Sequence, residues 1–315
     1  MGADALGVDI GGTKLLAVRV PQSGSDVREE IRLPTPSDGR AAVRSLREAV
    51  RSLFPEGSAP AAIGVGIPGL VDWRGRLGFS PHRPSLVGFP LRAALEQLWP
   101  ATPAWVGNDA TAAVWAEHQR GAGSGVDDVL MVTLGTGIGG GVVSDGRLRE
   151  GAHRFAGEFG HMVVDPNGPL CACGKRGCWE RFASGDGLGV LGREAALADR
   201  APRVCDLAGG DPEAVRGEHV TAAAAEGDAD AEEIMARFAW WLALGLASLA
   251  NAFDPSVIVV GGGLADAGDV LLEPTRSSFA SLVEAPEERA GLRVVPAALG
   301  SRAGAVGAGL LAAGW

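Results

Sequence analysis

The chain has 315 residues, of which 46% are hydrophobic and 21% charged, a globular composition long enough for two domains with separate cores. The net charge of −10 argues against nucleic acid or an anionic membrane surface as a partner. No basic segment followed by an apolar stretch opens the chain, and the apolar run at residues 238–253 is shorter than the roughly 20 residues of a bilayer span. These features predict a cytoplasmic protein.

The first element is a strand, a glycine turn and a second strand. Residues 6–10 and 15–20 are apolar and rich in β-branched side chains, and Gly11-Gly12-Thr13 separates them. A dinucleotide-binding or Walker loop would need a helix after the glycines, so the pattern indicates a hairpin instead. Because glycine has no Cβ, backbone N–H groups of such a turn can approach phosphate closely. Asp9 could hold Mg²⁺ through water, and Thr13 offers a hydroxyl to phosphate.

The same pattern returns about 125 residues later. Residues 129–134 form a predicted strand, Gly135-Thr-Gly-Ile-Gly-Gly-Gly141 is the expected turn, and Val142-Val143 resumes the strand. Thr136 again offers a hydroxyl. The repetition suggests two related halves that face each other, and it favours phosphate binding over two unrelated tight turns. A third glycine element, Gly261-Gly262-Gly263, follows the predicted strand at residues 257–260 and precedes a predicted helix.

Helices are expected between these glycine elements. Apolar residues recur at helical spacing between Val43 and Leu53, and a long helix is predicted over residues 230–251, where the apolar second half favours a buried position. The small residues at 300–315 predict a helix that packs closely against another element. Proline and glycine at residues 67–70 and 80–84 indicate loops at strand ends.

Asn108-Asp109 stands between a predicted strand and an alanine-rich helix at residues 110–119. One interpretation is a helix N-cap, since Asn and Asp are favoured there. The other is catalytic: Asp109 would accept the proton of an attacking hydroxyl while Asn108 orients the substrate. Phosphoryl transfer depends mainly on such a positioned carboxylate and on phosphate clamps.

Three of the four cysteines, Cys171, Cys173 and Cys178, fall within eight positions and follow His161. This set supplies the four N/S ligands of a tetrahedral zinc site, whereas a disulfide or a chance grouping is the alternative. Four protein ligands leave no position for a catalytic water, so the zinc would be structural. Glu158 and Glu180 flank the set, and the metal would hold both carboxylates in fixed positions.

Together these residues resemble the ROK family of sugar kinases and repressors, within the actin-like sugar kinase superfamily. The resemblance covers nearly the whole chain and rests on Asp9-Ile-Gly-Gly-Thr-Lys14, Asn108-Asp109, Gly135-Thr-Gly-Ile-Gly-Gly-Gly141, Glu158-x-Gly-His161, Cys171-x-Cys173-Gly-x-x-Gly-Cys178-x-Glu180 and Ala183-Ser-Gly185. The histidine and cysteine motifs in this order are the most specific part. The sequence is most similar to ATP-dependent bacterial glucokinases.

The resemblance implies ATP-dependent phosphorylation of glucose to glucose 6-phosphate, with Asp109 as the general base. The implied sugar ligands are Asn108, Asp109, Glu158, His161 and Glu180. The residues expected along the phosphate path of Mg²⁺–ATP are Asp9, Gly11, Gly12, Thr13, Lys14, Gly135, Thr136, Gly137 and Gly139. Gly261, Gly262 and Gly263 are expected near the adenosine, and His161, Cys171, Cys173 and Cys178 are expected on Zn²⁺.

The implied fold is α/β, the actin-like or ribonuclease H-like fold of sugar kinases, with two lobes and a cleft between them. The small lobe would hold residues 1–107 and 300–315, and the large lobe residues 108–299. Closure of the lobes on the sugar would exclude water. Family members are commonly homodimers or homotetramers, so the same is expected here.

One segment departs from the family. Many ROK glucokinases have Pro-Asn-Leu-Pro beside the sugar, where this chain has Ser80-Pro-His82-Arg-Pro84. A ROK kinase for N-acetylmannosamine, N-acetylglucosamine or fructose is therefore the alternative. A sugar-responsive repressor is less favoured, because residues before Asp9 leave no room for a DNA-binding module and the chain is acidic.

Overall fold

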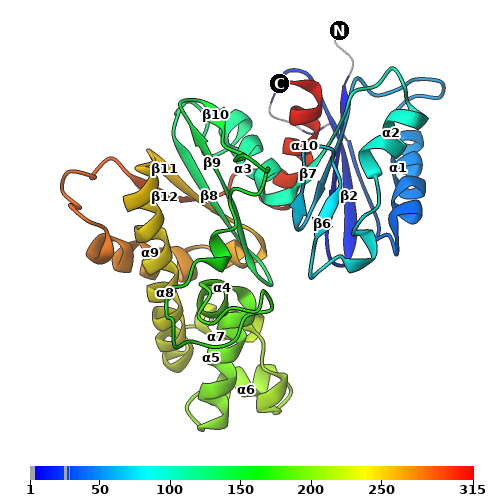
Figure 1. Cartoon of the computed structure of the whole chain (residues 1–315). Helices are drawn as coiled ribbons and strands as arrows, with labels where there is room; N and C mark the ends of the chain where they lie inside the picture. Colours follow the sequence, from blue (N-terminus) through cyan, green and yellow to red (C-terminus); the bar gives the residue numbers. More distant parts are fainter. Residues whose placement is uncertain (1–3, 25–26, 28) are drawn as a thin grey trace. The chain divides into compact units, whose positions relative to one another are not determined.

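The chain forms two compact units in the computed structural model, which describes residues 4–24, 27 and 29–315 (Figure 1). The first unit comprises residues 1–127, 141–157 and 298–315. The second unit comprises residues 128–140 and 158–297. Both are α/β, as the sequence predicts.

The first unit contains a five-stranded mixed sheet in the order β3-β2-β1-β4-β7. The strands are β1 (Ala5–Ile10), β2 (Lys14–Val20), β3 (Glu29–Pro34), β4 (Ile63–Ile67) and β7 (Ala104–Asn108). Strands β1 to β3 are antiparallel neighbours, and β1, β4 and β7 run parallel. A separate two-stranded sheet, β5 (Leu70–Val71) with β6 (Leu77–Phe79), follows β4.

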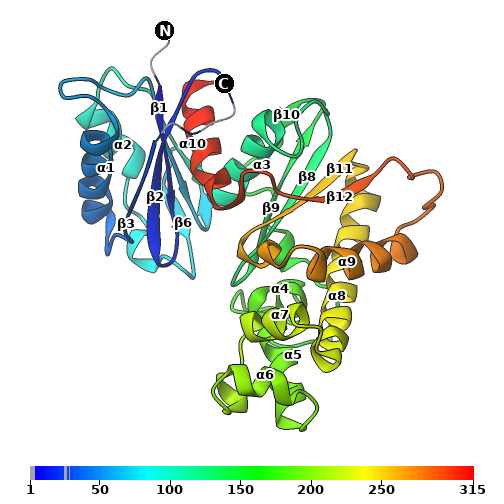
Figure 2. The ribbon, with the colours of Figure 1, turned by 180° about the vertical axis from the view of Figure 1, so that it is seen from behind.

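The two faces of this sheet differ because strand side chains alternate. Leu6, Val8 and Ile10 lie in the hydrophobic core together with residues of helices α1 (Gly39–Leu53) and α2 (Leu91–Leu98), which cover that face (Figures 1 and 2). Asp38 caps α1 by accepting a hydrogen bond from Ala41 N–H at 2.8 Å, and the predicted helix at residues 43–53 is confirmed.

The opposite face is lined by glycine and packs against α10 (Ala303–Ala313), which in turn packs along α3 (Asp109–Arg120). A Cβ on Gly7 would overlap the carbonyl of Ala305, and a Cβ on Gly64 would overlap that of Ala308. The predicted small-residue helix at the end of the chain is thus confirmed, and it lies against the backbone of β1 and β4.

The second five-stranded sheet repeats the order of the first, β10-β9-β8-β11-β12. Its strands are β8 (Val129–Leu134), β9 (Ile138–Ser144), β10 (Arg147–Leu148), β11 (Val257–Gly261) and β12 (Arg293–Pro296). An antiparallel β9–β10 pair and parallel β8, β11 and β12 match the first sheet strand for strand. The repeated hairpins in the sequence therefore mark two halves of the same topology.

The glycine run at residues 135–141 differs from the prediction of a single turn. The turn ends at Gly137, and Gly139, Gly140 and Gly141 belong to β9. A Cβ on Gly140 would meet the ring of Phe159, and one on Gly141 would meet Val114. These glycines are therefore needed for close packing within a strand and not for a turn.

The helices of the second unit gather around α8 (Ala229–Phe253), which packs against α9 (Asp269–Leu282) and contacts α4, α5 and α7. The remaining helices are α4 (Glu180–Ala183), α5 (Gly185–Leu197), α6 (Pro202–Leu207) and α7 (Gly217–Ala225). Short 3₁₀ turns are η1 (Pro84–Leu86), η2 (Phe159–His161), η3 (Pro212–Ala214), η4 (Gly263–Ala267) and η5 (Gly300–Arg302).

Helix α8 confirms the long helix predicted at residues 230–251. Among the described helices it is the one whose length and composition would allow it to cross a membrane. Most of its apolar window is buried against neighbouring helices, as in the core helix of a globular unit.

The compact units differ from the predicted lobes, which ended the first lobe at residue 107. Residues 108–127 and 141–157 belong to the first unit. The physical reason is packing. Helix α3 lies along α10, and the guanidinium of Arg154 contacts the rings of Trp73 and Trp105 and donates to Val106 O at 3.3 Å.

The contact between α10 and the glycine face can be tested with Gly64→Ala. The added methyl group would push against the Ala308 carbonyl, so we expect the free energy of unfolding to fall by about 1–3 kcal/mol, measured by urea denaturation. Gly291→Ala is the matched control, because a Cβ there meets no atom within 4 Å. An unchanged stability of Gly64→Ala would contradict the close backbone contact.

Candidate active site

Several of the predicted site residues of the first unit lie at the carboxyl ends of its parallel strands. Asp9 of β1 pairs with Gly66 of β4, and Gly66 pairs with Gly107 of β7, one residue before Asn108. In open α/β sheets this edge is the usual place for ligands. The sheet thus brings Asp9, Asn108 and Asp109 to one edge although a hundred residues separate them.

Asp9 and Asp109 adjoin each other because the elements between them carry glycine. Gly66 leaves space beside Asp109, where a Cβ would lie 3.2 Å from Asp109 Cα. Gly304 of α10 does the same for Asp9, since a Cβ there would lie 3.1 Å from Asp9 Oδ2 and 3.6 Å from Asp109 O. These two glycines therefore make room for the carboxyl group of Asp9 and for the backbone of Asp109.

The electrostatics of this pair are unusual. Burial, and then the neighbouring Asp109, raise the pKa of Asp9 from 3.8 to about 7, against a lowering effect of Lys14. Burial also raises the pKa of Asp109, although the Ala110 N–H that donates to its Oδ1 at 2.9 Å and the nearby His82 act in the opposite direction. Two half-buried carboxyl groups that repel each other are typical of a functional site.

Asp9 also fits a divalent cation. Its Oδ1 is buried and finds no hydrogen-bond donor among the described residues. An unpaired buried carboxylate oxygen next to a second carboxylate is the kind of oxygen donor that Mg²⁺ prefers, either directly or through water. Asp9 can therefore hold Mg²⁺, with Asp109 close by.

Asn108 is the N-cap of α3, so the structural interpretation of Asn108-Asp109 is confirmed. Its Oδ1 accepts from Thr111 N–H at 2.9 Å, and its Nδ2 donates to Gly69 O at 3.2 Å. The cap fixes the orientation of the first helical turn and leaves Asp109 partly exposed. Capping and catalysis are thus compatible here.

The first glycine turn, at residues 11–13, is a closed hairpin turn. Gly11 N–H donates to Lys14 O at 3.0 Å, and Thr35 Oγ1 donates to Gly11 O at 3.0 Å. Gly12, Thr13 and Lys14 are exposed, so the hydroxyl of Thr13 is accessible to a ligand. An arginine that we did not predict as a site residue, Arg83, reaches Gly12 O with Nη1 at 3.3 Å. The only sequence signal for it is its place in the divergent segment at residues 80–84.

The second glycine turn, at residues 135–137, lies at the corresponding edge of the other sheet. Gly135 N–H donates to Gly137 O at 3.0 Å, and Gly185 N–H donates to Gly135 O at 2.8 Å. Thr136 is exposed. Gly262 has a φ of +84° and packs against the backbone of Leu134, so residues 261–263 lie beside this turn. The phosphate and adenosine elements predicted for this unit are therefore neighbours, whereas Gly139 lies in β9.

The four predicted metal ligands converge. One ligand atom each of His161, Cys171, Cys173 and Cys178 can be chosen so that all four lie within 4.8 Å of one another. Cys173 Sγ and Cys178 Sγ are 3.5 Å apart, and Cys171 Sγ is 3.8 Å from His161 Nδ1. These separations suit a tetrahedral site with three sulfur ligands and one nitrogen, so the donor set fits Zn²⁺.

The loop that carries the cysteines is held by its own backbone. Cys171 N–H donates to Lys175 O at 2.8 Å, and Gly174 N–H donates to Cys171 O at 2.9 Å. Gly174 has a φ of +87°, which favours glycine. Burial raises the pKa of Cys171 and of Cys178, so metal binding there would displace protons from these thiols.

His161 lies between the two predicted sugar-binding glutamates. Its Nδ1 is 3.5 Å from Glu180 Oε1 on the cysteine side, and its Nε2 is 3.8 Å from Glu158 Oε2. Glu180 also lies at the second glycine turn, because a Cβ on Gly137 would come 2.8 Å from Glu180 Oε2. The metal ligands, both glutamates and the second glycine turn therefore form one group.

Trp179 anchors this group to the core of the second unit. The ring is fully buried, its Nε1 donates to Trp241 O of α8 at 2.8 Å, and Gly245 leaves the space that the ring occupies. The residue lies between Cys178 and Glu180, so the tryptophan fixes a ligand on one side and a carboxylate on the other.

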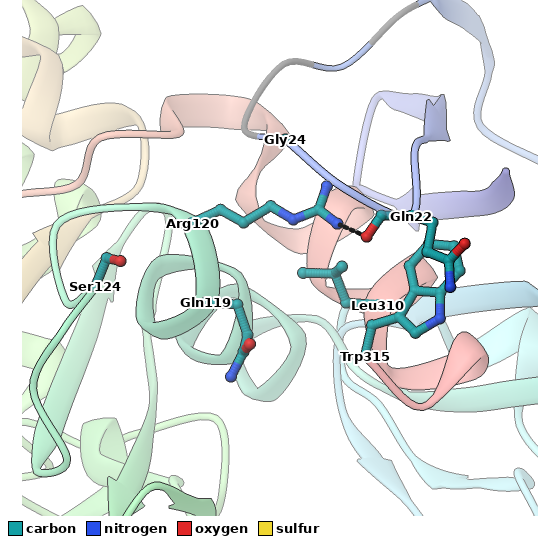
Figure 3. A pocket seen from close by; sticks show the side chains of 7 residues that line it. All are labelled: Gln22, Gly24, Gln119, Arg120, Ser124, Leu310 and Trp315. Atoms are coloured by element: carbon teal, nitrogen blue, oxygen red, sulfur yellow. Dashed lines mark hydrogen bonds between the residues drawn. The ribbon is translucent and has the colours of Figure 1, made fainter. Parts of the chain in front are cut away.

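A pocket of about 360 Å³ in the first unit lies away from these residues (Figure 3). Its lining includes Gln119 and Arg120 at the C-terminal end of α3, roughly 16 Å along the helix from Asp109. The other lining residues are Gln22, Gly24, Ser124, Leu310 and Trp315. None of the predicted site residues lines this pocket.

The raised pKa of Asp9 predicts a pH-dependent stability without Mg²⁺ or nucleotide. Between the usual pKa of 3.8 and the raised pKa of about 7, the folded chain keeps a proton on Asp9 that the unfolded chain has lost. The contribution of Asp9 to the free energy of unfolding is therefore most favourable below about pH 4, and it is lost as the pH rises through about 7. Asparagine carries no charge at any pH. We therefore expect the Tm of Asp9→Asn to exceed that of the wild type by more at about pH 8 than at about pH 5. An equal difference at both pH values would contradict the buried, protonated state of Asp9.

The chain is similar to known proteins over most of its length. The model of the ROK family matches residues 5–314. The chain is 39% identical over 310 residues to a glucokinase of Streptomyces coelicolor, covering 98% of this chain and 96% of that protein. It is 36% identical over 272 residues to an N-acetylmannosamine kinase of Escherichia coli O127:H6, covering 85% and 86%.

A solved structure is similar over the same length. The ROK family glucokinase from Streptomyces griseus, in complex with glucose and AMPPNP, has 39% sequence identity and a TM-score of 0.86, and the match covers 98% of both chains. The fold is therefore that of the actin-like sugar kinases, as the resemblance implied. With a family match over almost its entire length, this chain belongs to the ROK family.

Proposed function

We propose that the protein catalyses the ATP-dependent phosphorylation of glucose to glucose 6-phosphate. The full-length similarity to glucokinases supports a hexose kinase. The observation that carries the proposal is the pair of half-buried carboxyl groups, Asp9 and Asp109, at the carboxyl edge of the first sheet. One carboxylate suits a general base, and the other suits the cation that accompanies ATP.

In this proposal Asp109 accepts the proton of the 6-hydroxyl as that oxygen attacks the γ-phosphorus of ATP. The new O6–P bond forms while the bond between the γ-phosphorus and the β,γ-bridging oxygen breaks, and ADP leaves with that oxygen. A pKa of Asp109 above the usual range makes its carboxylate a better proton acceptor near neutral pH. Asn108, held as the cap of α3, would orient the sugar.

The phosphates of ATP would be bound by the two glycine turns, whose exposed backbone can approach phosphate oxygens. Asp9 would hold Mg²⁺, which neutralises phosphate charge when bound. Thr13 and Thr136 are exposed and offer hydroxyls, and residues 261–263 would lie near the adenosine. Lys14 and Gly139 remain predicted members of the phosphate path.

The sugar hydroxyls would be bound by Glu158, His161 and Glu180. With Nδ1 of His161 directed to the cysteines, Nε2 is the nitrogen on the side of Glu158. A metal-bound imidazole keeps its second ring nitrogen for another partner, and such contacts fix its orientation. The His–Cys₃ cluster would hold Zn²⁺ as a structural ion that keeps His161 and Glu180 in place.

A related sugar is the alternative substrate. The N-acetylmannosamine kinase relative is nearly as similar as the glucokinases over the part that matches. The segment with His82 and Arg83 departs from the family pattern beside the expected sugar. We further propose a cytoplasmic location and a homodimer or homotetramer, in line with the reduced cysteines and with the family.

A coupled assay of ADP release over a panel of hexoses tests the substrate. Glucose should give the highest kcat/KM, and a higher value for N-acetylmannosamine, N-acetylglucosamine or fructose would assign the alternative.

Asp109→Asn keeps the helix start but cannot accept the proton, so kcat should fall by at least about 100-fold. Tm and the glucose Kd of this variant should stay near the wild-type values. A kcat close to that of the wild type would contradict the role of Asp109 as the general base.

Zinc is tested by metal analysis and by Cys173→Ser. We expect about one Zn²⁺ per wild-type chain, and its loss by chelation or by Cys173→Ser should lower Tm and raise the KM for glucose more than that for ATP. Cys205→Ser is the matched control, because Cys205 lies in α6 outside the cluster. A metal-free protein with full sugar affinity would contradict the structural role of the cluster.

A further inference from the structure

Arg83 lies in a loop of the first unit whose backbone is held by the side chain of Ser80. Ser80 is only 4% exposed, and its Oγ donates to Pro68 O at 2.6 Å while accepting from Arg83 N–H at 3.0 Å. The next residue after Pro68, Gly69, accepts from Asn108 Nδ2 at 3.2 Å. The loop of Arg83 and the cap of α3 are therefore attached to adjacent residues, Pro68 and Gly69.

The guanidinium of Arg83 reaches two other segments of the same unit. Nη2 donates to the carbonyl of the buried Pro36 at 2.6 Å, and Nη1 donates to Gly12 O at 3.3 Å. Nε is buried and has no hydrogen-bond acceptor among the described residues. Arg83 thus joins the loop at residues 80–84 to the first glycine turn and leaves one buried donor unused.

The charge of Arg83 is not balanced by an ion pair with any described residue. Across the described part of the chain, no carboxylate oxygen lies within 4.0 Å of its guanidinium. Burial lowers its pKa, yet an arginine side chain keeps its proton in proteins. The acceptors of its guanidinium, Gly12 O and Pro36 O, are neutral carbonyls, so a bound anion would supply the negative charge that this partly buried cation lacks.

Arg154 of the same unit shows what a structural arginine looks like. Its Nε donates to Glu150 Oε1 at 2.7 Å, and its guanidinium lies 5.0 Å and 5.2 Å from the ring centres of Trp73 and Trp105. That arginine is neutralised and enclosed by its own protein. Arg83 is not, which points to a ligand that supplies the missing negative charge.

The contacts of Arg83 also determine which backbone groups of the first glycine turn remain available to a ligand. The carbonyl oxygen of Gly11 accepts a hydrogen bond from Thr35 Oγ1, and that of Gly12 accepts one from Arg83 Nη1. Within the described residues, the backbone N–H groups of Gly12 and Thr13 donate to no protein acceptor. A turn with its carbonyls bound and its N–H groups unused is suited to an anion.

We propose that Arg83 is a positioning residue for phosphate: it fixes the first glycine turn through Gly12 O and supplies positive charge to the phosphate group that the turn binds. This inference rests on the proposed kinase function and extends it to a residue outside the predicted site. The nearby carboxylates of Asp9 and Asp109 repel a polyphosphate, and Arg83 offsets part of that repulsion.

The test compares Arg83→Met and Arg83→Lys with the wild type. Binding of Mg²⁺–AMPPNP is measured by calorimetry, binding of glucose by tryptophan fluorescence, and kcat and KM by the coupled assay. Arg83→Met should raise the Kd of Mg²⁺–AMPPNP and the KM for ATP by about 10-fold or more, because a charge-assisted contact is lost. The glucose Kd should change by less than about 2-fold. Arg83→Lys keeps the charge and should recover part of the nucleotide affinity.

Arg76→Met is the matched control, since Arg76 is an exposed arginine of the same unit that pairs with Asp72 and should leave all constants unchanged. Wild-type nucleotide affinity in Arg83→Met would overturn the inference while leaving the kinase function intact. Equal losses of nucleotide and glucose affinity in both Arg83 variants, with a lowered Tm, would also overturn it by showing a purely structural role. A wild-type protein that binds no Mg²⁺–AMPPNP would overturn the proposed function together with the inference.

Discussion

The close backbone contact between α10 and strands β1 and β4 is the constraint on which the first unit depends. It requires glycine at positions 7 and 64 of the strands, and it leaves the opposite face of the same strands to form the apolar core with α1 and α2. The same contact continues at Gly304, which makes room for Asp9 and Asp109. The packing that stabilises the unit thus also brings its two carboxyl groups together.

Some buried charged groups of the first unit have hydrogen-bond partners for all their buried polar atoms, and others do not. Glu117 is fully buried and accepts hydrogen bonds from the N–H groups of Ala122, Ala298 and Leu299, so its role is structural. Asp9 and Arg83 each keep a buried polar atom that no described residue satisfies. Unsatisfied buried groups cost stability unless a ligand completes them, as we propose for both residues.

In the second unit, rigidity comes from a different source. The His–Cys₃ cluster lies in a segment with little regular structure. Backbone hydrogen bonds of Cys171 with Lys175 and Gly174 hold its loop, and Trp179 anchors it to α8. A metal held by four of its side chains would fix Glu180 and His161 as firmly as a strand would, which suits residues that select a sugar.

The sequence by itself determined the strand and glycine hairpins, the long buried helix α8, the cap at Asn108 and the ligand set of the His–Cys₃ cluster, because each depends on neighbours in the chain. Tertiary structure decided the rest. Residues 139–141 extend a strand because Phe159 and Val114 pack on them, and residues 108–127 belong with the first unit because α3 packs along α10. The pairing of Asp9 with Asp109, and the reach of Arg83 to Gly12, join residues that are 100 and 71 positions apart. No local pattern encodes such contacts, since they arise only when the sheet and its glycine-lined helix come together.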